Sequence, residues 1–150
     1  MVLKFAWELT SRDHLIWQDG VVDQLKVLSS GYNLENSLLS LGGFTAFAFA
    51  HSWDLVRSEG IAMLQWLIEV GTELSSEVIL VPFFGNAEIR QEDLTFERFV
   101  DGWKLVADTT EKLNVWLGIE STIDITVHQF IIDQVGAKSV WYGQCNYIWL

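Results

Sequence analysis

Three histidines are the first residues of this sequence whose side chains could take part in chemistry. Each has an aspartate within four positions along the chain. The pairs are His14 with Asp13, His51 with Asp54, and His128 with Asp124. A carboxylate can orient an imidazole for metal binding or proton transfer, but no two histidines share the helical spacing of a metal site. The sequence therefore predicts no catalytic residue and no metal ligand, only three separate polar side chains at strand ends.

A row of carboxylates is the second candidate. On a helix, a spacing of four places Asp93, Glu97 and Asp101 side by side, and Asp108 and Glu111 continue the same flank. Clustered acids serve metal-dependent nucleases and glycosidases, but catalytic acids lie in clefts rather than on a solvated helix face. Neighbouring like charges cost about 0.2–0.5 kcal/mol per pair in helix stability. The row is therefore interpreted either as a solvated face or as a binding surface for a basic partner.

The end of the chain is rich in aromatic rings and amides. The residues concerned are Trp141, Tyr142, Gln144, Asn146, Tyr147 and Trp149. Such a surface suits sugar or peptide binding, and Trp141 and Tyr142 are included in the predicted partner surface. The favoured alternative is that the rings pack on a helix as core, because Trp103 and Trp116 need large partners. Cys145 has no visible activating base and is predicted to be structural.

Two amphipathic helices are expected to position these groups. Apolar residues recur at helical spacing over 53–70, with Ser52 as a possible N-cap and Gly71 as a possible stop. The strongest helical pattern runs over 93–117, and Gly118 would end it.

Short apolar segments predict the strands. Expected strands cover 3–9, 44–50, 78–84, 122–128 and 139–150. Asp19-Gly20 is predicted to be a hairpin turn, with a helix over 15–28 as the alternative, and 34–41 fits a helix or a strand. Because few helices alternate with the strands, the predicted fold class is α+β: a mostly antiparallel sheet of about five strands with two main amphipathic helices packed on one face. Residues 1–150 are expected to form a single domain.

Composition narrows the function classes. Twenty carboxylates against nine Lys and Arg give a formal net charge of −11, which argues against binding nucleic acid or an anionic membrane. The single cysteine allows no internal disulfide, and no signal peptide is recognised at the N-terminus, so the expected compartment is the cytoplasm. The short motifs of nucleotide, phosphate and zinc enzymes are missing, so no cofactor is expected.

These observations lead to a predicted binding protein rather than an enzyme. A small acidic protein can capture a basic protein partner by electrostatic attraction, as an immunity-type inhibitor does when it neutralises a toxic nuclease. The binding residues would be Asp93, Glu97, Asp101, Asp108, Glu111, Trp141 and Tyr142. Two alternatives remain open: a carbohydrate or small-molecule binding domain with an aromatic-lined pocket, and an enzyme that uses carboxylate or histidine chemistry.

Overall fold

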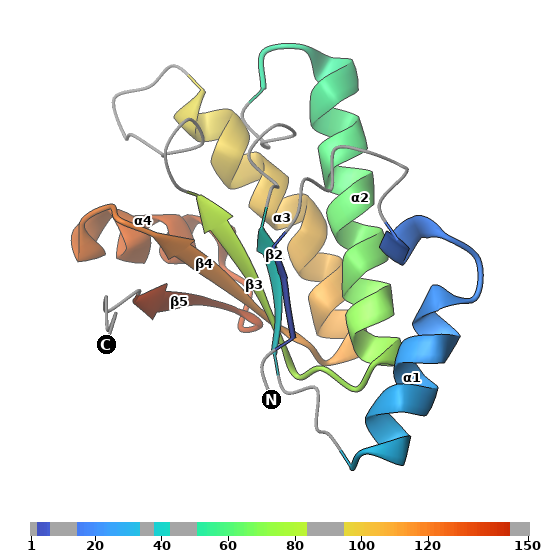
Figure 1. Cartoon of the computed structure of the whole chain (residues 1–150). Helices are drawn as coiled ribbons and strands as arrows, with labels where there is room; N and C mark the ends of the chain where they lie inside the picture. Colours follow the sequence, from blue (N-terminus) through green and yellow to red (C-terminus); the bar gives the residue numbers. More distant parts are fainter. Residues whose placement is uncertain (1–2, 7–14, 34–37, 43–50, 84–94, 145–150) are drawn as a thin grey trace.

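Strands and helices alternate along the chain in the computed structural model (Figure 1). The structure describes residues 3–6, 15–33, 38–42, 51–83 and 95–144. The strands are β1 (Leu3–Ala6), β2 (Leu38–Gly42), β3 (Val78–Phe83), β4 (Trp116–Ser121) and β5 (Val140–Gln144). The helices are α1 (Val21–Gly31), α2 (Asp54–Glu73), α3 (Phe96–Leu113) and α4 (Ile125–Val135), with a 3-10 turn, η1 (Leu15–Trp17), before α1.

The sheet is parallel throughout, so the predicted α+β class is wrong. Its five strands lie in sequence order, β1-β2-β3-β4-β5, and each neighbouring pair is parallel. Parallel neighbours require a crossover connection, and in each case a helix supplies it. The fold class is therefore α/β. An alternating apolar pattern predicts a strand but not its direction, which is why the antiparallel prediction failed.

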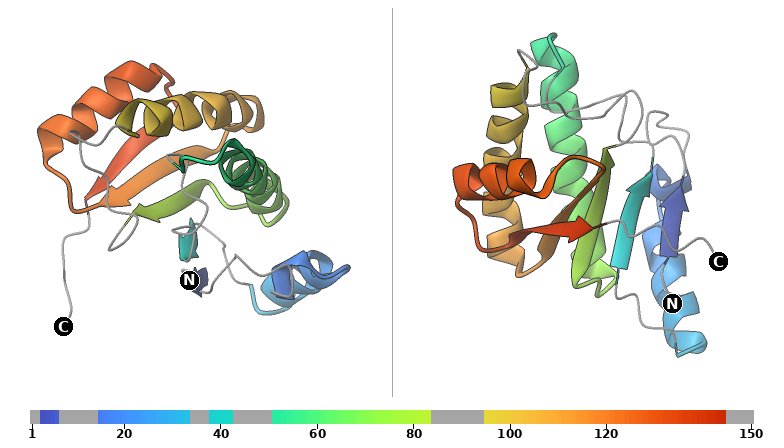
Figure 2. Two further views of the ribbon diagram at one scale, coloured as in Figure 1. Left: turned by 90° about the horizontal axis from the view of Figure 1, so that it is seen from above. Right: turned by 90° about the vertical axis from the view of Figure 1, so that its left-hand side faces the viewer.

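The helices form one layer on one side of a curved sheet. Seen from above, α1, α2, α3 and α4 follow the sheet in order along its convex side, and no described helix lies on the concave side (Figure 2). Right-handed crossovers place successive helices on the same face in this way. The prediction of two main helices is thus corrected to four.

The long helix α2 confirms the predicted helix over 53–70, but both predicted ends are wrong. Trp53 takes the N-cap position without a side-chain hydrogen bond, rather than Ser52. Gly71 lies inside the helix, which continues to Glu73. A Cβ on Gly71 would lie 2.8 Å from Cδ1 of Ile79, so this glycine lets α2 approach β3 closely instead of ending the helix.

The core fills the space between α3 and the sheet. Trp103 is fully buried and packs edge-on against Phe83 and Phe99, with ring centroids 5.9 and 6.0 Å away.

The predicted helix over 93–117 is present as α3, but it ends at Leu113. Asn114 takes a left-handed conformation with a φ of 55°, and the chain then enters β4. Trp116 and Leu117 belong to that strand, so Gly118 is not a helix cap.

The strand predicted over 122–128 is wrong, because most of this segment belongs to helix α4. Asp124 instead begins α4, because its carboxylate accepts hydrogen bonds from the backbone N and the Oγ1 of Thr126 at 2.8 and 2.6 Å. β-branched residues in 122–128 favour a strand by intrinsic propensity, but the cap and the packing of α4 against α3 and β5 outweigh that preference.

The remaining predictions divide between confirmed, wrong and undescribed segments. The strand over 78–84 is confirmed as β3, and the strand alternative for 34–41 is confirmed in part as β2. The hairpin at Asp19-Gly20 is wrong, since Gly20, with a φ of 80°, is the N-cap of α1. Residues 7–9, 44–50 and 145–150 of the predicted strands lie outside the described residues. In the described part of the chain, no helix combines the length and apolarity needed to cross a membrane.

Candidate active site at the carboxyl edge of the sheet

All described strands end at the same edge of the sheet because they are parallel. In open α/β sheets, ligands bind outside the carboxyl ends of the strands. The connection from β4 to α4, residues 122–124, is the strand-to-helix connection at this edge that the structure describes in full. Side chains at the end of β4 are therefore the first place to look for a site.

Glu120 is the penultimate residue of β4 and points to the concave face. Its neighbours Ile119 and Ser121 are buried on the helix-covered face, and side chains alternate along a strand. Glu120 is partly buried and lies in register with Pro82 of β3 and Gly143 of β5. Among the described side chains of β3 and β4 that face the concave side, Glu120 is the one that carries a charge.

Ser121 and His128 form a hydrogen bond on the opposite face. Oγ of Ser121 lies 2.9 Å from Nε2 of His128, and the two residues are 4% and 0% exposed. Burial lowers the pKa of His128 below its usual 6.5, so the imidazole is neutral at pH 7, although the nearby Asp124 acts in the opposite direction. A serine and a histidine at this distance resemble a nucleophile with its base. Because helix α4 covers both, we interpret the pair as a link that fixes β4 to α4 and so positions Glu120.

The aspartates that neighbour His51 and His128 in sequence hold other groups in the described part of the chain. The carboxylate of Asp124 caps α4 through Thr126, and these hydrogen bonds lower the pKa of Asp124. Asp54 pairs with Arg98 at 3.0 Å, while Nδ1 of His51 accepts a hydrogen bond from the backbone N of Trp53. His14 and Asp13 lie outside the described residues.

The predicted partner surface is divided between two sides of the molecule. Glu97, Asp101, Asp108 and Glu111 are exposed on α3, in the outer layer. Two of them have local partners: Asp101 pairs with Lys104 at 3.4 Å, and Glu111 accepts a hydrogen bond from the backbone N of Lys138. Asp93 lies outside the described residues. That a basic partner binds these acids stays a prediction.

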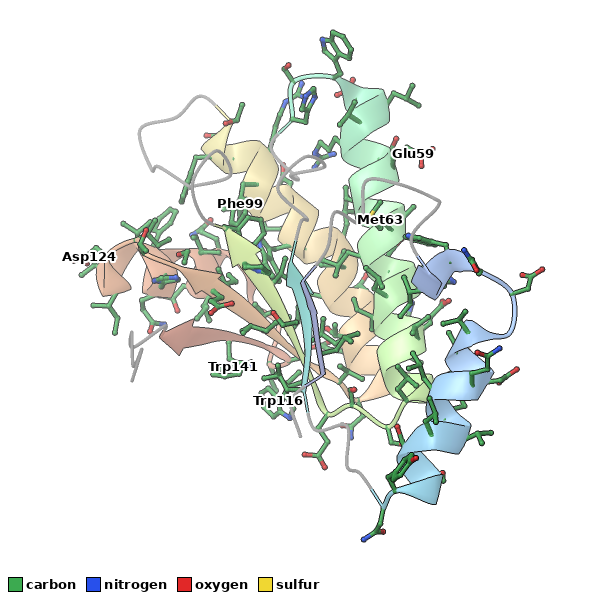
Figure 3. The ribbon with its side chains drawn as sticks, in the orientation of Figure 1. Glu59, Met63, Phe99, Trp116, Asp124 and Trp141 are labelled. Carbon is green, nitrogen blue, oxygen red and sulfur yellow. The ribbon has the colours of Figure 1, made fainter. Side chains whose placement is uncertain are left out.

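The aromatic residues of that prediction belong to β5. Trp141 lies on the concave side, where its ring would be 3.4 Å from a Cβ placed on Gly118 (Figure 3). It therefore does not pack against α3, and Trp103 finds its partners in Phe83 and Phe99 instead. Tyr142 occupies the next position of β5, in register with Ile119. Cys145, Tyr147 and Trp149 lie outside the described residues.

Two of the hollows in the described part of the chain are lined by residues other than the strand ends at the carboxyl edge. One, of about 440 Å³, lies beside the amino ends of β4 and β5 and is lined by Glu111, Asn114, Trp116 and Lys138, among others. The other, of similar volume, lies beside the stacked rings of Trp17 and Trp66, whose centroids are 4.1 Å apart. Glu120 lines neither of these two hollows.

The sequence does not point to Glu120 because the elements predicted around it are misplaced. With the helix extended to Leu117 and the next strand begun at Thr122, Glu120 fell in a connecting loop. The available signal was the helix cap at Asp124, which marks a helix start and therefore a strand end just before it.

Solved structures show what this arrangement resembles. Neither a protein-family model nor a curated protein sequence matches the chain. A D-psicose 3-epimerase, solved in the presence of D-fructose, superposes with a TM-score of 0.72 and 14% identity over 86% of this chain and 49% of its own. The 3-keto-D-glucoside 4-epimerase YcjR from E. coli gives 0.68 and 14% over 82% and 52%. A xylose isomerase-like TIM barrel protein from Mycobacterium smegmatis, in complex with magnesium, gives 0.66 and 12% over 84% and 46%.

The chain has the fold of half a TIM barrel. It spans about half the length of these proteins, and sequence-ordered parallel strands with an outer layer of helices are the construction of such barrels. The prediction of an immunity-type inhibitor is wrong, because the solved structures that this half barrel resembles include sugar epimerases. Size and charge, on which that prediction relied, do not specify a fold.

One of these similar proteins was solved in complex with magnesium. The described side chains of this half barrel were compared with what a metal ion needs. Among the described residues, no three His, Cys, Asp or Glu lie close enough together to hold one. Glu120 faces the concave side, whereas Asp124 is held by Thr126 and His128 is buried under α4. The described donors therefore do not fit a metal ion.

Proposed function

We propose that this half barrel belongs to a sugar-converting enzyme that moves a proton at the carbon next to a carbonyl group, the step shared by sugar isomerases and epimerases. The observation that carries the proposal is the position of Glu120: a carboxylate on the concave face, at the carboxyl end of a central strand. Catalytic residues of TIM-barrel enzymes come from the carboxyl ends of strands. The epimerases among the similar structures support the substrate class.

In the proposed step, Glu120 acts as general base. Its carboxylate removes a proton from the carbon beside the carbonyl, and the C–H electron pair forms the C=C bond of an enediolate while the carbonyl oxygen takes the negative charge. Returning a proton to carbon, at the neighbouring position or from the other side, gives the isomer or the epimer. A positioned base contributes about 10²–10⁴-fold to such a step. The link between Ser121 and His128 keeps the end of β4 fixed, and that in turn orients Glu120.

The test is proton exchange with solvent. The chain is incubated with D-fructose, D-psicose and D-tagatose in D₂O, and deuterium entering the carbons beside the carbonyl is followed by NMR. We expect exchange with at least one ketose, and a loss of about 10²-fold or more in Glu120→Gln. The matched control is Asp101→Asn, which makes the same carboxylate-to-amide change on the outer face of α3 and should retain the full rate.

Two results would contradict the proposal. One is the absence of exchange with all three ketoses in a folded chain. The other is an equal rate in Glu120→Gln and the unmodified protein, which would remove Glu120 as the base.

A further inference from the structure

The concave face of the sheet is apolar and incompletely covered. The described side chains on this face are Leu38, Ser40, Val78, Leu80, Pro82, Trp116, Glu120 and Trp141. Each is at least partly exposed, and Trp116 is 50% exposed. Figure 3 shows Trp116 and Trp141 on the side of the sheet away from α2 and α3.

An open face of this kind is unusual for a parallel sheet. Sheets made only of parallel strands occur almost always with both faces covered, because their strands are apolar on both sides. Here the helices cover one side (Figure 2). Among the described elements, no helix covers the concave side, so this face is left for a partner.

The edges of the sheet indicate what could cover that face. Within the described residues, β1 pairs only with β2 and β5 only with β4, so each has one open edge. A twofold rotation about an axis along the strands keeps all strands pointing the same way. It also places the β5 edge of each copy beside the β1 edge of the other, which makes two equivalent junctions. A second copy therefore meets both edges with parallel strands, as a closed barrel requires.

The share of the similar barrels that this chain spans also fits a second copy. The chain spans 49% and 52% of the first two similar barrels, so what completes them is about as long as this chain. The net charge of −11 makes two copies repel, but on the concave face Glu120 is the one charged residue among the side chains listed above. The repulsion therefore comes mostly from outside the contact, where salt screens it.

We propose that two copies of this chain pack concave face against concave face in a twofold dimer. The proposal rests on the shape of the half barrel and not on its proposed chemistry, although the dimer would place the Glu120 of both copies at one common edge. Salt weakens the binding of an acidic protein to a basic partner, because it screens their attraction. Salt should strengthen this dimer, because it screens the repulsion between two acidic copies. The salt dependence therefore separates the two kinds of contact.

The experiment measures the mass of the 150-residue chain by sedimentation equilibrium over a wide concentration range. We expect a reversible monomer–dimer equilibrium around the monomer mass of 17.1 kDa, with a dissociation constant that decreases several-fold between about 0.05 M and about 0.5 M NaCl. Trp116→Asp places a charge in the contact and should weaken the dimer by about a hundredfold or more. Its matched control is Leu105→Asp on the outer face of α3, where the native side chain is 51% exposed, and this variant should dimerise normally.

A second variant guards against a folding defect. Leu80→Asp tests the centre of the concave face, and circular dichroism establishes whether each variant stays folded. Dimers disrupted by Trp116→Asp and Leu80→Asp, but not by Leu105→Asp, support the proposal. A folded chain that stays monomeric at all concentrations overturns it, and so does an assembly weakened equally by the outer-face control. The mass measurement does not depend on proton exchange with sugars. The dimer can therefore form if the proposed activity is absent, and the activity can be present if no dimer forms.

Discussion

The two faces of the same sheet differ sharply in how completely they are packed. On the convex face, Ile79, Val81, Leu117 and Ile119 are each 0% exposed under the helices. On the concave face, the side chains next to them along the same strands remain at least partly exposed: Val78, Leu80, Pro82, Trp116 and Glu120. Both faces are apolar, so composition does not distinguish them. This difference in exposure arises because the strands carry apolar side chains on both faces, while the described helices cover only one face.

Adjacent residues of β3 give the largest expected contrast. Ile79→Ala removes a fully buried side chain and should lower the free energy of unfolding by about 2–5 kcal/mol, because the packed helix layer cannot close the cavity. Leu80→Ala changes the next residue, which is partly exposed on the concave face, and should cost about 1 kcal/mol or less in dilute protein. Urea unfolding of both variants measures the difference.

Unfolding of Ile79→Ala and Leu80→Ala at several protein concentrations tests whether a second copy covers the concave face. If a second copy covers the concave face, the cost of Leu80→Ala increases with concentration while that of Ile79→Ala does not. Equal costs for the two substitutions in dilute protein would contradict the difference in packing.

Two glycines test the faces by adding a methyl group instead of removing one. A Cβ on Gly71 would lie 2.8 Å from Cδ1 of Ile79 in the closed layer, and overpacking typically costs about 1–3 kcal/mol. The better helix propensity of alanine returns about 1 kcal/mol, so Gly71→Ala should destabilise the protein by up to about 2 kcal/mol.

Gly118→Ala is the matched change on the concave face. Its Cβ would lie 2.9 Å from Cδ1 of Leu80, a flexible side chain that can turn toward the open side. Because alanine is also preferred over glycine in a strand by about 0.5–1 kcal/mol, we expect little net change in dilute protein. Thermal unfolding of the two variants side by side measures this contrast, and a larger loss in Gly118→Ala would show that the concave face is as rigid as the convex one.

The smallest expected effect concerns pH and the helix-covered end of β4. Burial lowers the pKa of His128 in the folded protein, so the unfolded chain binds the proton more readily. Stability should therefore be complete above the usual value of 6.5 and decrease as pH falls below it. His128→Gln should flatten that decrease in unfolding curves recorded between about pH 7.5 and pH 5.

Two further groups serve as controls for that measurement. His51→Gln alters a partly exposed histidine and should retain the decrease. Asp124 has a pKa lowered below its usual 3.8 by the hydrogen bonds from Thr126, so its contribution is lost only at more acidic pH. A slope unchanged in His128→Gln would mean that another group causes the pH dependence.

Helix α2 and strand β3 show what could be predicted from local pattern. In 53–70 the helical period is long and clear, and in 78–84 the apolar run is short and bounded, so both were located correctly. The connection from β4 to α4 could not be located in this way. Its β-branched residues favour a strand, and only the cap at Asp124 and the contact between Ser121 and His128 decide for a helix.

The sequence by itself determined the acidity of the chain, the amphipathic pattern of α3 and the apolar character of the strands, because these depend on residue type and short spacing. Tertiary structure alone decided that the strands are parallel, that Glu120 lies on the concave face at the carboxyl edge, and that the acids of α3 are on the opposite side of the molecule from Trp141. The physical reason is that strand direction and the pairing of faces depend on which distant segments meet, and hydrophobic spacing along the chain does not encode that choice.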